Sequence, residues 1–284
     1  MTRTRMTKAH VEQLEDQILS VLSDDHPQSV RHVFYRMTDP RLPVVIEKSE
    51  RGYGQVQRRM VEMRRSGMLP YGWIADATRR GYHVNTFRDR SDFLRRMSGL
   101  YRADLWSDLP TYVEVWVESR SLAGVLQATC EHYAVSLYPA GGFSSLTLVH
   151  EASEAISLEL ECGKERALIL YVGDFDPAGV LIDQSIETEM RRHLPNDAVV
   201  EFRRIAINEE QIALYELPTK PRKPGDKRAA HVQATVEAEA MPAHLMKSLL
   251  RAEIDAELPA QHMKAIQVAE ESEIQAINLL ALAS

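Results

Sequence analysis

The chain has 284 residues, 44% of them hydrophobic, which is enough for one large domain or two domains of ordinary size. No stretch is long and apolar enough to span a membrane, and the polar N-terminal stretch argues against a signal peptide. Two cysteines without metal-ligand spacing, Cys130 and Cys162, predict no disulfide framework. We therefore expect a protein of the reducing cytoplasm that makes no membrane contact.

The net charge of −7 is unusual for a protein that binds DNA, but the charge is unevenly distributed. Residues 1–110 hold 19 lysines and arginines against 14 acidic residues, whereas the remainder holds 15 against 27. A basic half beside an acidic half indicates nucleic-acid contact by the basic half. Chance variation in surface charge is the alternative explanation.

Three helices are predicted in the first 67 residues. Residues 9–23 have apolar positions near helical spacing. Ser29 can cap a second helix, whose apolar residues at positions 30, 33, 34 and 37 form one stripe. After a short β-like piece at 44–46, a third helix begins at Ser49 or Glu50 and closes at Gly67. Four arginines of this third helix lie largely off its apolar stripe: Arg58, Arg59, Arg64 and Arg65.

A turn and strand at 68–74 and a second turn at 79–82 complete the pattern of a winged helix-turn-helix domain. In that plan the basic third helix enters the major groove of double-stranded DNA and the wing contacts phosphate. The alternative is a solvated arginine face on an ordinary helix. A polar connector follows at 83–110, and we place the boundary between two domains, 1–108 and 109–284, near Pro110.

After Pro110 strands and helices alternate. Strands are expected at 112–117, 134–138, 167–172 and 199–205, with helices at 121–132, at about 146–160 and after 179. This alternation predicts a parallel α/β sheet. The tail from about Pro242 is expected to be helical, with a break near Pro259.

Carboxylates follow two of the predicted strands. Glu118 comes directly after the first strand, and Asp174 and Asp176 come directly after the third. Functional side chains of parallel sheets gather at the carboxyl ends of the strands, so the three can converge. Such oxygen ligands suit Mg²⁺, with Mn²⁺ as the alternative ion, and the ion could hold a phosphodiester. Alternatively, an aspartate at this position simply caps the next helix.

Together these motifs resemble a known family. Glu118 after a strand, followed by Asp-Phe-Asp-Pro-Ala-Gly at 174–179, resembles the Toprim signature in the form found in the cleavage subunit of topoisomerase VI and in the meiotic double-strand-break transesterase. The resemblance covers roughly residues 28–80 and 110–255 and implies a winged-helix domain followed by a Toprim domain that binds Mg²⁺. One departure is Ser119-Arg120, where many relatives have a lysine directly after the glutamate.

The same family attacks DNA with a winged-helix tyrosine and stays bound through a 5′-phosphotyrosyl link. Its motif, an arginine four residues before a tyrosine, matches Arg31 and Tyr35, which share a helix face. A guanidinium nearby helps a phenolate to form and can grip the scissile phosphate. The alternatives are that Tyr35 is an ordinary half-buried aromatic, or that Tyr53 is the nucleophile. His32 could assist proton transfer, although a surface histidine is the simpler expectation.

The predicted function is therefore DNA cleavage by tyrosine transesterification at a Mg²⁺-dependent Toprim site in a nucleoid-associated protein. The resemblance further implies a homodimer, in which the tyrosine of one protomer meets the metal of the other, and an ATPase partner for strand passage. The sequence has no Gly-X-X-X-X-Gly-Lys-Ser/Thr loop of its own. A hydrolytic Toprim nuclease and a non-catalytic DNA-binding module remain the alternatives.

Overall fold

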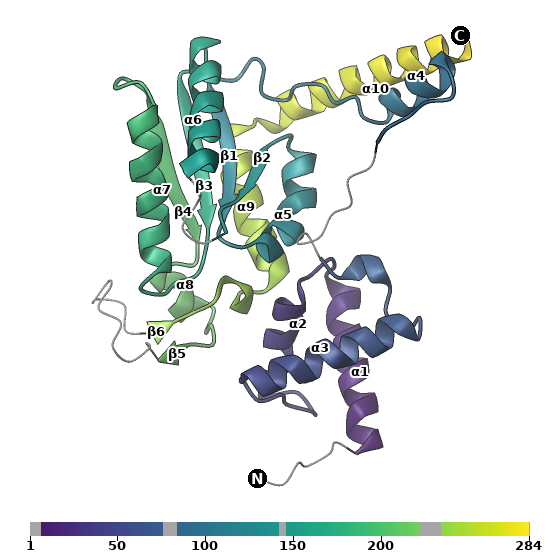
Figure 1. The fold of residues 1–284 in the computed structure, drawn as a ribbon, viewed down its shortest axis with the longest axis vertical. Helices are drawn as coiled ribbons and strands as arrows, with labels where there is room; N and C mark the ends of the chain where they lie inside the picture. Colours follow the sequence, from purple (N-terminus) through teal and green to yellow (C-terminus); the bar gives the residue numbers. More distant parts are fainter. Residues whose placement is uncertain (1–6, 76–83, 142–145, 222–233, 284) are drawn as a thin grey trace.

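The structure, a computed structural model, describes residues 7–75, 84–141, 146–221 and 234–283. It is an α/β protein with a four-stranded parallel sheet in the order β2-β1-β3-β4 (Figure 1). The strands match the predicted ones within two residues at either end: β1 (Thr111–Val117), β2 (Ser136–Pro139), β3 (Arg166–Val172) and β4 (Val200–Ala206).

Helices cover both faces of the sheet. Helices α5 (Arg120–His132) and α9 (Ala243–Glu257) lie on one face, and α6 (Leu146–Glu161) and α7 (Gly179–His193) lie on the other (Figure 1). The central strands are therefore buried on both sides, which explains why β3 is an almost continuous apolar run. Trp116 and Tyr171 belong to the core on the α6–α7 side, whereas their neighbours Val115 and Leu170 belong to the core on the α5–α9 side.

The N-terminal part contains the three predicted helices, α1 (Lys8–Asp24), α2 (Val30–Met37) and α3 (Glu50–Arg65). Ser29 caps α2 as predicted, since its side chain accepts a hydrogen bond from the His32 amide. The strand expected at 68–74 is instead the short 3-10 helix η1 (Tyr71–Trp73), followed by one isolated bridge from Ile74 to Gln28. Residues 44–46 form no strand, and the expected turn at 79–82 lies outside the described residues.

The connector is not wholly irregular. It contains helix α4 (Arg90–Ser98), which packs against the last helix, α10 (Ala260–Leu282), and the two project together from the body (Figure 1). Ser98 donates a hydrogen bond of 2.8 Å to the Asn278 side chain. The tail is helical with a break at Pro259, as predicted. No described helix combines the length and apolar character needed to cross a membrane.

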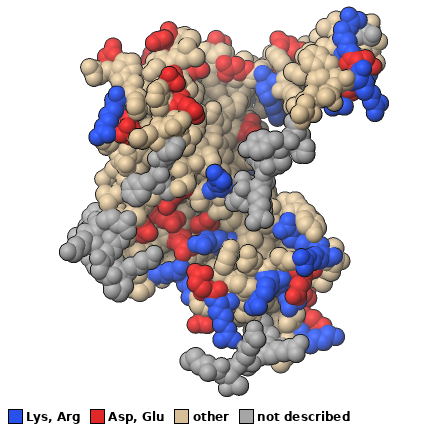
Figure 2. All heavy atoms as spheres, viewed as in Figure 1, with Lys and Arg blue, Asp and Glu red and all other residues tan. Residues whose placement is uncertain are grey.

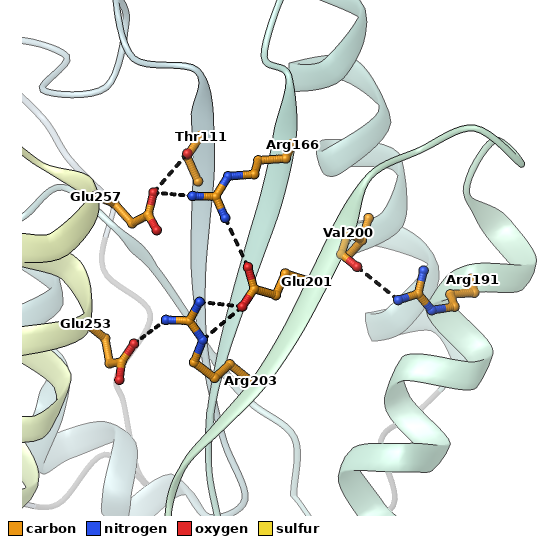
Figure 3. A network of polar contacts seen from close by, with 8 residues as sticks. All are labelled: Thr111, Arg166, Arg191, Val200, Glu201, Arg203, Glu253 and Glu257. Carbon is orange, nitrogen blue, oxygen red and sulfur yellow. Dashed lines mark hydrogen bonds and ion pairs between the residues drawn. The ribbon is translucent and has the colours of Figure 1, made fainter.

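A network of charged side chains ties α9 to the sheet at the end where the strands begin (Figure 3). Arg166 bridges Glu201 on β4 and Glu257 on α9 at 3.0 and 2.6 Å. Arg203 links Glu201 to Glu253 in the same way. The pairing fixes α9 against β3 and β4. It also leaves the segment just before α9 at the opposite end of the sheet, where the strands finish.

The remaining elements lie between β4 and α9. They are α8 (Glu209–Leu214), the two-stranded pair β5 (Lys220–Pro221) and β6 (Ala234–Thr235), and the 3-10 helix η2 (Ala238–Ala240).

Candidate functional site

The carboxylate of Glu118 is joined to the end of the neighbouring strand. Its Oε2 accepts a hydrogen bond of 2.8 Å from the backbone amide of Asp174. Between them lies Gly173, where a Cβ would come within 2.6 Å of the Tyr171 ring and 2.9 Å of Glu118 Oε2. Only glycine fits here without displacing one of them, so the glycine before Asp174 is part of the site's construction.

Arg204 on β4 holds the turn that carries the two aspartates. Its guanidinium donates to the backbone oxygens of Gly173, Asp174 and Gly179 over 2.7 to 3.3 Å. Its Nε donates to Asp183 on α7 at 2.7 Å, in a pair of which both members are largely buried. The turn is therefore anchored from two elements at once.

A segment distant in sequence completes the acidic cluster. Phe175 and Val236 exchange two backbone hydrogen bonds of 2.8 Å, so the chain before α9 runs alongside the Asp174 turn. The Ala238 amide then donates to Asp174 Oδ1 at 2.8 Å. This places Glu239, whose Oε1 accepts from the Ser121 hydroxyl at 2.7 Å, at the same end of the sheet. The Glu-Ala-Glu run at 237–239 was the only signal of it in the sequence.

Asp176 has a different local role. Its Oδ1 accepts hydrogen bonds from the amides of Ala178 and Gly179 at 2.8 and 2.6 Å, at the start of α7. This is the geometry of the helix-capping alternative. Its charge nevertheless acts on the cluster, because it helps to raise the pKa of Glu118.

Burial and like charge act together on the cluster. Burial first, and then the neighbouring carboxylates Glu118 and Glu239, hold the pKa of Asp174 well above its usual range. The pKa of Glu118 is raised by burial and by Asp176, against the effect of its hydrogen bond from the Asp174 amide. A cation bound beside these crowded acids would stabilise their ionised forms.

The donors suit Mg²⁺ in chemistry, although the described part of the chain holds no preformed cage. Among the described residues, no three histidine, cysteine or acidic side chains are arranged to hold a metal ion. Magnesium, however, is commonly bound by one or two carboxylates together with water and substrate phosphate. Glu118, Asp174 and Glu239 each commit one oxygen to a hydrogen bond within the protein. Their second oxygens supply the hard donors that this ion prefers, so the residues fit it.

The cluster opens into a cavity of about 590 Å³ between the sheet and the N-terminal helices. Glu118, Asp174 and Glu239 line one side. The other side includes Arg31 on α2, and Tyr53 and Arg64 on α3. Figure 2 shows acidic side chains gathered where the two parts meet, with basic side chains next to them on the helical part. The cavity therefore combines carboxylates that suit a cation with guanidiniums that suit a phosphate.

Tyr35 lies beside this cavity rather than in its lining. It is 3% exposed, and the Glu237 carboxylate lies close enough to act on its hydroxyl. Burial and the Glu237 carboxylate raise its pKa far above the usual value, outweighing the opposite effect of Arg31. Arg31 itself pairs with Glu237 at 2.7 Å. The structure thus brings Arg31 and Tyr35 together around one carboxylate, but in a state that disfavours the phenolate.

His32 differs from the expectation of a surface histidine. It is fully buried, and burial lowers its pKa to about 3. Its Nδ1 hydrogen-bonds with the Ser29 hydroxyl at 2.9 Å, within the cap of α2. His32 is therefore a neutral core residue, because α2 turns this position toward the helical core.

The four arginines of α3 do not form one open face. Arg59 pairs with Glu15 on α1 at 3.1 Å and with Glu62 at 2.6 Å. Arg58 donates to the backbone oxygen of Gly54 at 3.1 Å, while Arg64 lines the cavity. Arg65 is exposed at the end of the helix. Their directions differ because α3 turns by about 100° per residue.

No family model, curated protein or solved structure matches the chain.

Proposed function

We propose that the protein cleaves DNA in a Mg²⁺-dependent reaction at the cavity between its helical part and its sheet. One observation carries the proposal: Glu118, Asp174 and Glu239 face the same space as Arg31 and Arg64. A phosphodiester needs both kinds of group, since guanidiniums bind its oxygens and carboxylates hold the metal.

Glu118 and Asp174 would hold Mg²⁺, with Glu239 beside them. The ion would neutralise charge that develops on the phosphate during displacement. Binding and orienting the phosphate fall to side chains of the protein. Arg31 and Arg64 bind and orient the phosphate, while Arg204 keeps the Asp174 turn in place.

For the chemical step we propose transesterification by Tyr35, in the manner of the cleavage subunit of topoisomerase VI, within a winged-helix segment formed by α1 to α3. The Tyr35 oxygen attacks phosphorus, a tyrosyl–phosphate bond forms, and the bond to the 3′ oxygen breaks. The departing oxygen takes a proton. Because α2 has to leave the Glu237 segment before Tyr35 can react, the phenol proton passes to water, and water supplies the proton that the departing 3′ oxygen takes.

This reaction requires α2 to separate from the Glu237 segment, since Tyr35 is buried there. In a homodimer of the proposed kind, the exposed Tyr35 would meet the carboxylates of the other protomer. Strand passage would further need an ATPase partner.

The burial of Tyr35 favours a second candidate, hydrolysis of the phosphodiester by water at the same carboxylates. In that case the product carries no protein, and Tyr35 serves only to pack α2 against η2.

The two candidates are separated by incubating the protein with supercoiled plasmid and Mg²⁺ or Mn²⁺, stopping with SDS, and assaying DNA-linked protein. Tyr35→Phe is the test variant, Tyr71→Phe, at an exposed tyrosine, is the matched control, and Asp174→Asn removes a metal ligand. An adduct lost only in Tyr35→Phe and Asp174→Asn supports transesterification. Cleavage without adduct, lost only in Asp174→Asn, supports hydrolysis. Metal-independent or absent cleavage contradicts both and leaves a DNA-binding module.

A further inference from the structure

The wall of the cavity opposite the carboxylates is one side of α3. Tyr53, Gln57, Val61 and Arg64 recur at helical spacing along it and all line the cavity. The volume of about 590 Å³ lies in the range of sites for small ligands. The space between α3 and the carboxylates is thus suited to a nucleotide-sized group.

This arrangement does not suit a DNA duplex that binds with α3 in its major groove. A helix that reads the major groove presents its polar side outward, free of its own protein. Here that side faces Glu118 and Asp174 across the cavity, and Arg59 is already paired with Glu15 and Glu62. A duplex lying on α3 would be held away from the carboxylates, whereas a single strand can pass between the two walls.

The wall also carries an aromatic platform. The Tyr53 ring packs edge-on against Phe34, with centroids 5.6 Å apart and planes at 84°, which fixes its orientation. The Arg31 guanidinium lies 5.4 Å from the centroid of the Tyr53 ring. Aromatic rings flanked by arginines are the usual means by which proteins bind single-stranded nucleic acid.

Arg64 adds a cation with one unpaired hydrogen-bond donor. Its guanidinium lies over the Tyr71 ring at 4.5 Å, and its buried Nε has no hydrogen-bond partner among the described residues. A buried donor without a partner is costly, and a phosphate oxygen in the cavity would supply one.

We propose that the cavity takes single-stranded DNA, with one base stacked on Tyr53 and its phosphate held by Arg31 and Arg64 on the side of the carboxylates. The proposal rests on the proposed function, since it names the substrate of the same site. It implies that a duplex is cut only where one strand has been separated or splayed from its partner.

The test is fluorescence anisotropy with a labelled ten-nucleotide thymidine single strand and a labelled duplex of the same length. Calcium replaces magnesium, and the salt concentration is the same for both probes. We expect the single strand to bind about 10-fold more tightly than the duplex or better. Tyr53→Ala should weaken single-strand binding by about 5- to 150-fold, because a stacked base contributes about 1–3 kcal/mol. Tyr53→Phe, which keeps the ring, should bind like the wild type.

Phe93→Ala, at an exposed aromatic on α4 far along the chain from the cavity, is the control and should change nothing. Gln57→Glu provides a second variant at an exposed position that tolerates substitution, and its added negative charge should weaken single-strand binding several-fold. Equal or tighter duplex binding overturns the proposal, as does full single-strand binding by folded Tyr53→Ala and Gln57→Glu. Tyr53-dependent binding without any cleavage would defeat the proposed function alone.

Discussion

Glu237 accepts a hydrogen bond of 2.7 Å from the Arg31 guanidinium, 206 residues earlier in the chain. The same carboxylate accepts a hydrogen bond of 2.6 Å from the Lys220 ammonium and acts on the nearby Tyr35 hydroxyl. Burial works against ionisation of Glu237, but Lys220 and Arg31 together lower its pKa below the usual value. Glu237 is therefore an anion that locks α2 onto the segment before η2.

Replacing Glu237 with Gln should lower the pKa of Tyr35 while leaving it above the usual value, because burial, the larger cause, remains. Loss of the partly exposed ion pair should cost about 1 kcal/mol of unfolding free energy or less. Because Glu237 holds α2 in the arrangement that buries Tyr35, its replacement should speed adduct formation by up to about 5-fold, the equivalent of about 1 kcal/mol. Alkaline difference spectra of Glu237→Gln, with Tyr35→Phe to assign the signal, measure the first effect. An unchanged or slower rate of adduct formation would show that release of α2 from Glu237 does not limit the reaction.

Arg204→Ala should loosen the Asp174 turn, although Arg204 does not line the cavity. The substitution leaves Asp183 buried without its partner and frees three backbone oxygens of the Asp174 turn, so we expect a loss of about 3–5 kcal/mol in unfolding free energy. Arg192→Ala, which removes an exposed pair with Glu189, should cost under about 0.5 kcal/mol. Urea denaturation compares the two. Equal effects would show that the Arg204 contacts do not hold the turn.

Gly179→Ala should displace Asp174 directly. A Cβ at this position would lie 2.2 Å from the Asp174 backbone oxygen, and that oxygen cannot move without moving the turn. We expect a loss of about 1–3 kcal/mol and the loss of metal-dependent cleavage. Gly72→Ala is the matched control, since nothing lies within 4 Å of its added methyl group. Wild-type cleavage by Gly179→Ala would mean that the position of Asp174 does not matter.

The four strands of the sheet and the long helices around them were predictable because each is encoded locally, whereas α4 and η1 were not predicted. The run 167–172 is apolar throughout, as a strand buried on both faces must be, and residues 30–37 carry a helical stripe behind a serine cap. Glu118 and Asp174 were found for the same reason, since parallel strands finish at one edge.

Other parts of the site depend on contacts that no local pattern encodes. Glu239 joins the cluster only because Val236 pairs with Phe175 some sixty residues away. Tyr35 was identified from its spacing to Arg31, but its raised pKa comes from burial and from Glu237, about two hundred residues later in the chain. The arginines of α3 were grouped by sequence, whereas their separate partners are set by the packing of α1 and by the cavity.

A buried acid far from the proposed chemistry makes the fold sensitive to pH. Glu114 on β1 is fully buried, accepting hydrogen bonds from Trp116 Nε1 at 2.8 Å and from the Tyr112 hydroxyl at 3.1 Å. Burial raises its pKa to about 7, although Trp116, Tyr112 and Tyr138 partly oppose the shift by hydrogen bonding.

The folded state therefore holds a proton that the unfolded chain releases near pH 4.5. The stability associated with this proton is complete below about pH 4.5 and is lost as the pH rises through about 7. Between pH 5.5 and 8.5 the wild type should lose about 2 kcal/mol through this group. Glu114→Gln cannot ionise, and its amide can donate to the Tyr112 oxygen, so the variant should match the wild type only below about pH 4.5. It should already exceed the wild type at pH 5.5, and its advantage should grow by about 2 kcal/mol by pH 8.5.

Urea denaturation of both proteins across this pH range gives the difference directly. Glu161→Gln, at an exposed acid on α6, is the control and should follow the wild type at every pH. A constant difference between Glu114→Gln and the wild type would mean that Glu114 keeps the same protonation state throughout the range. A wild-type advantage that grows with pH would mean that the ionised carboxylate is stabilised by its three neighbours, Tyr112, Trp116 and Tyr138, more than burial penalises it.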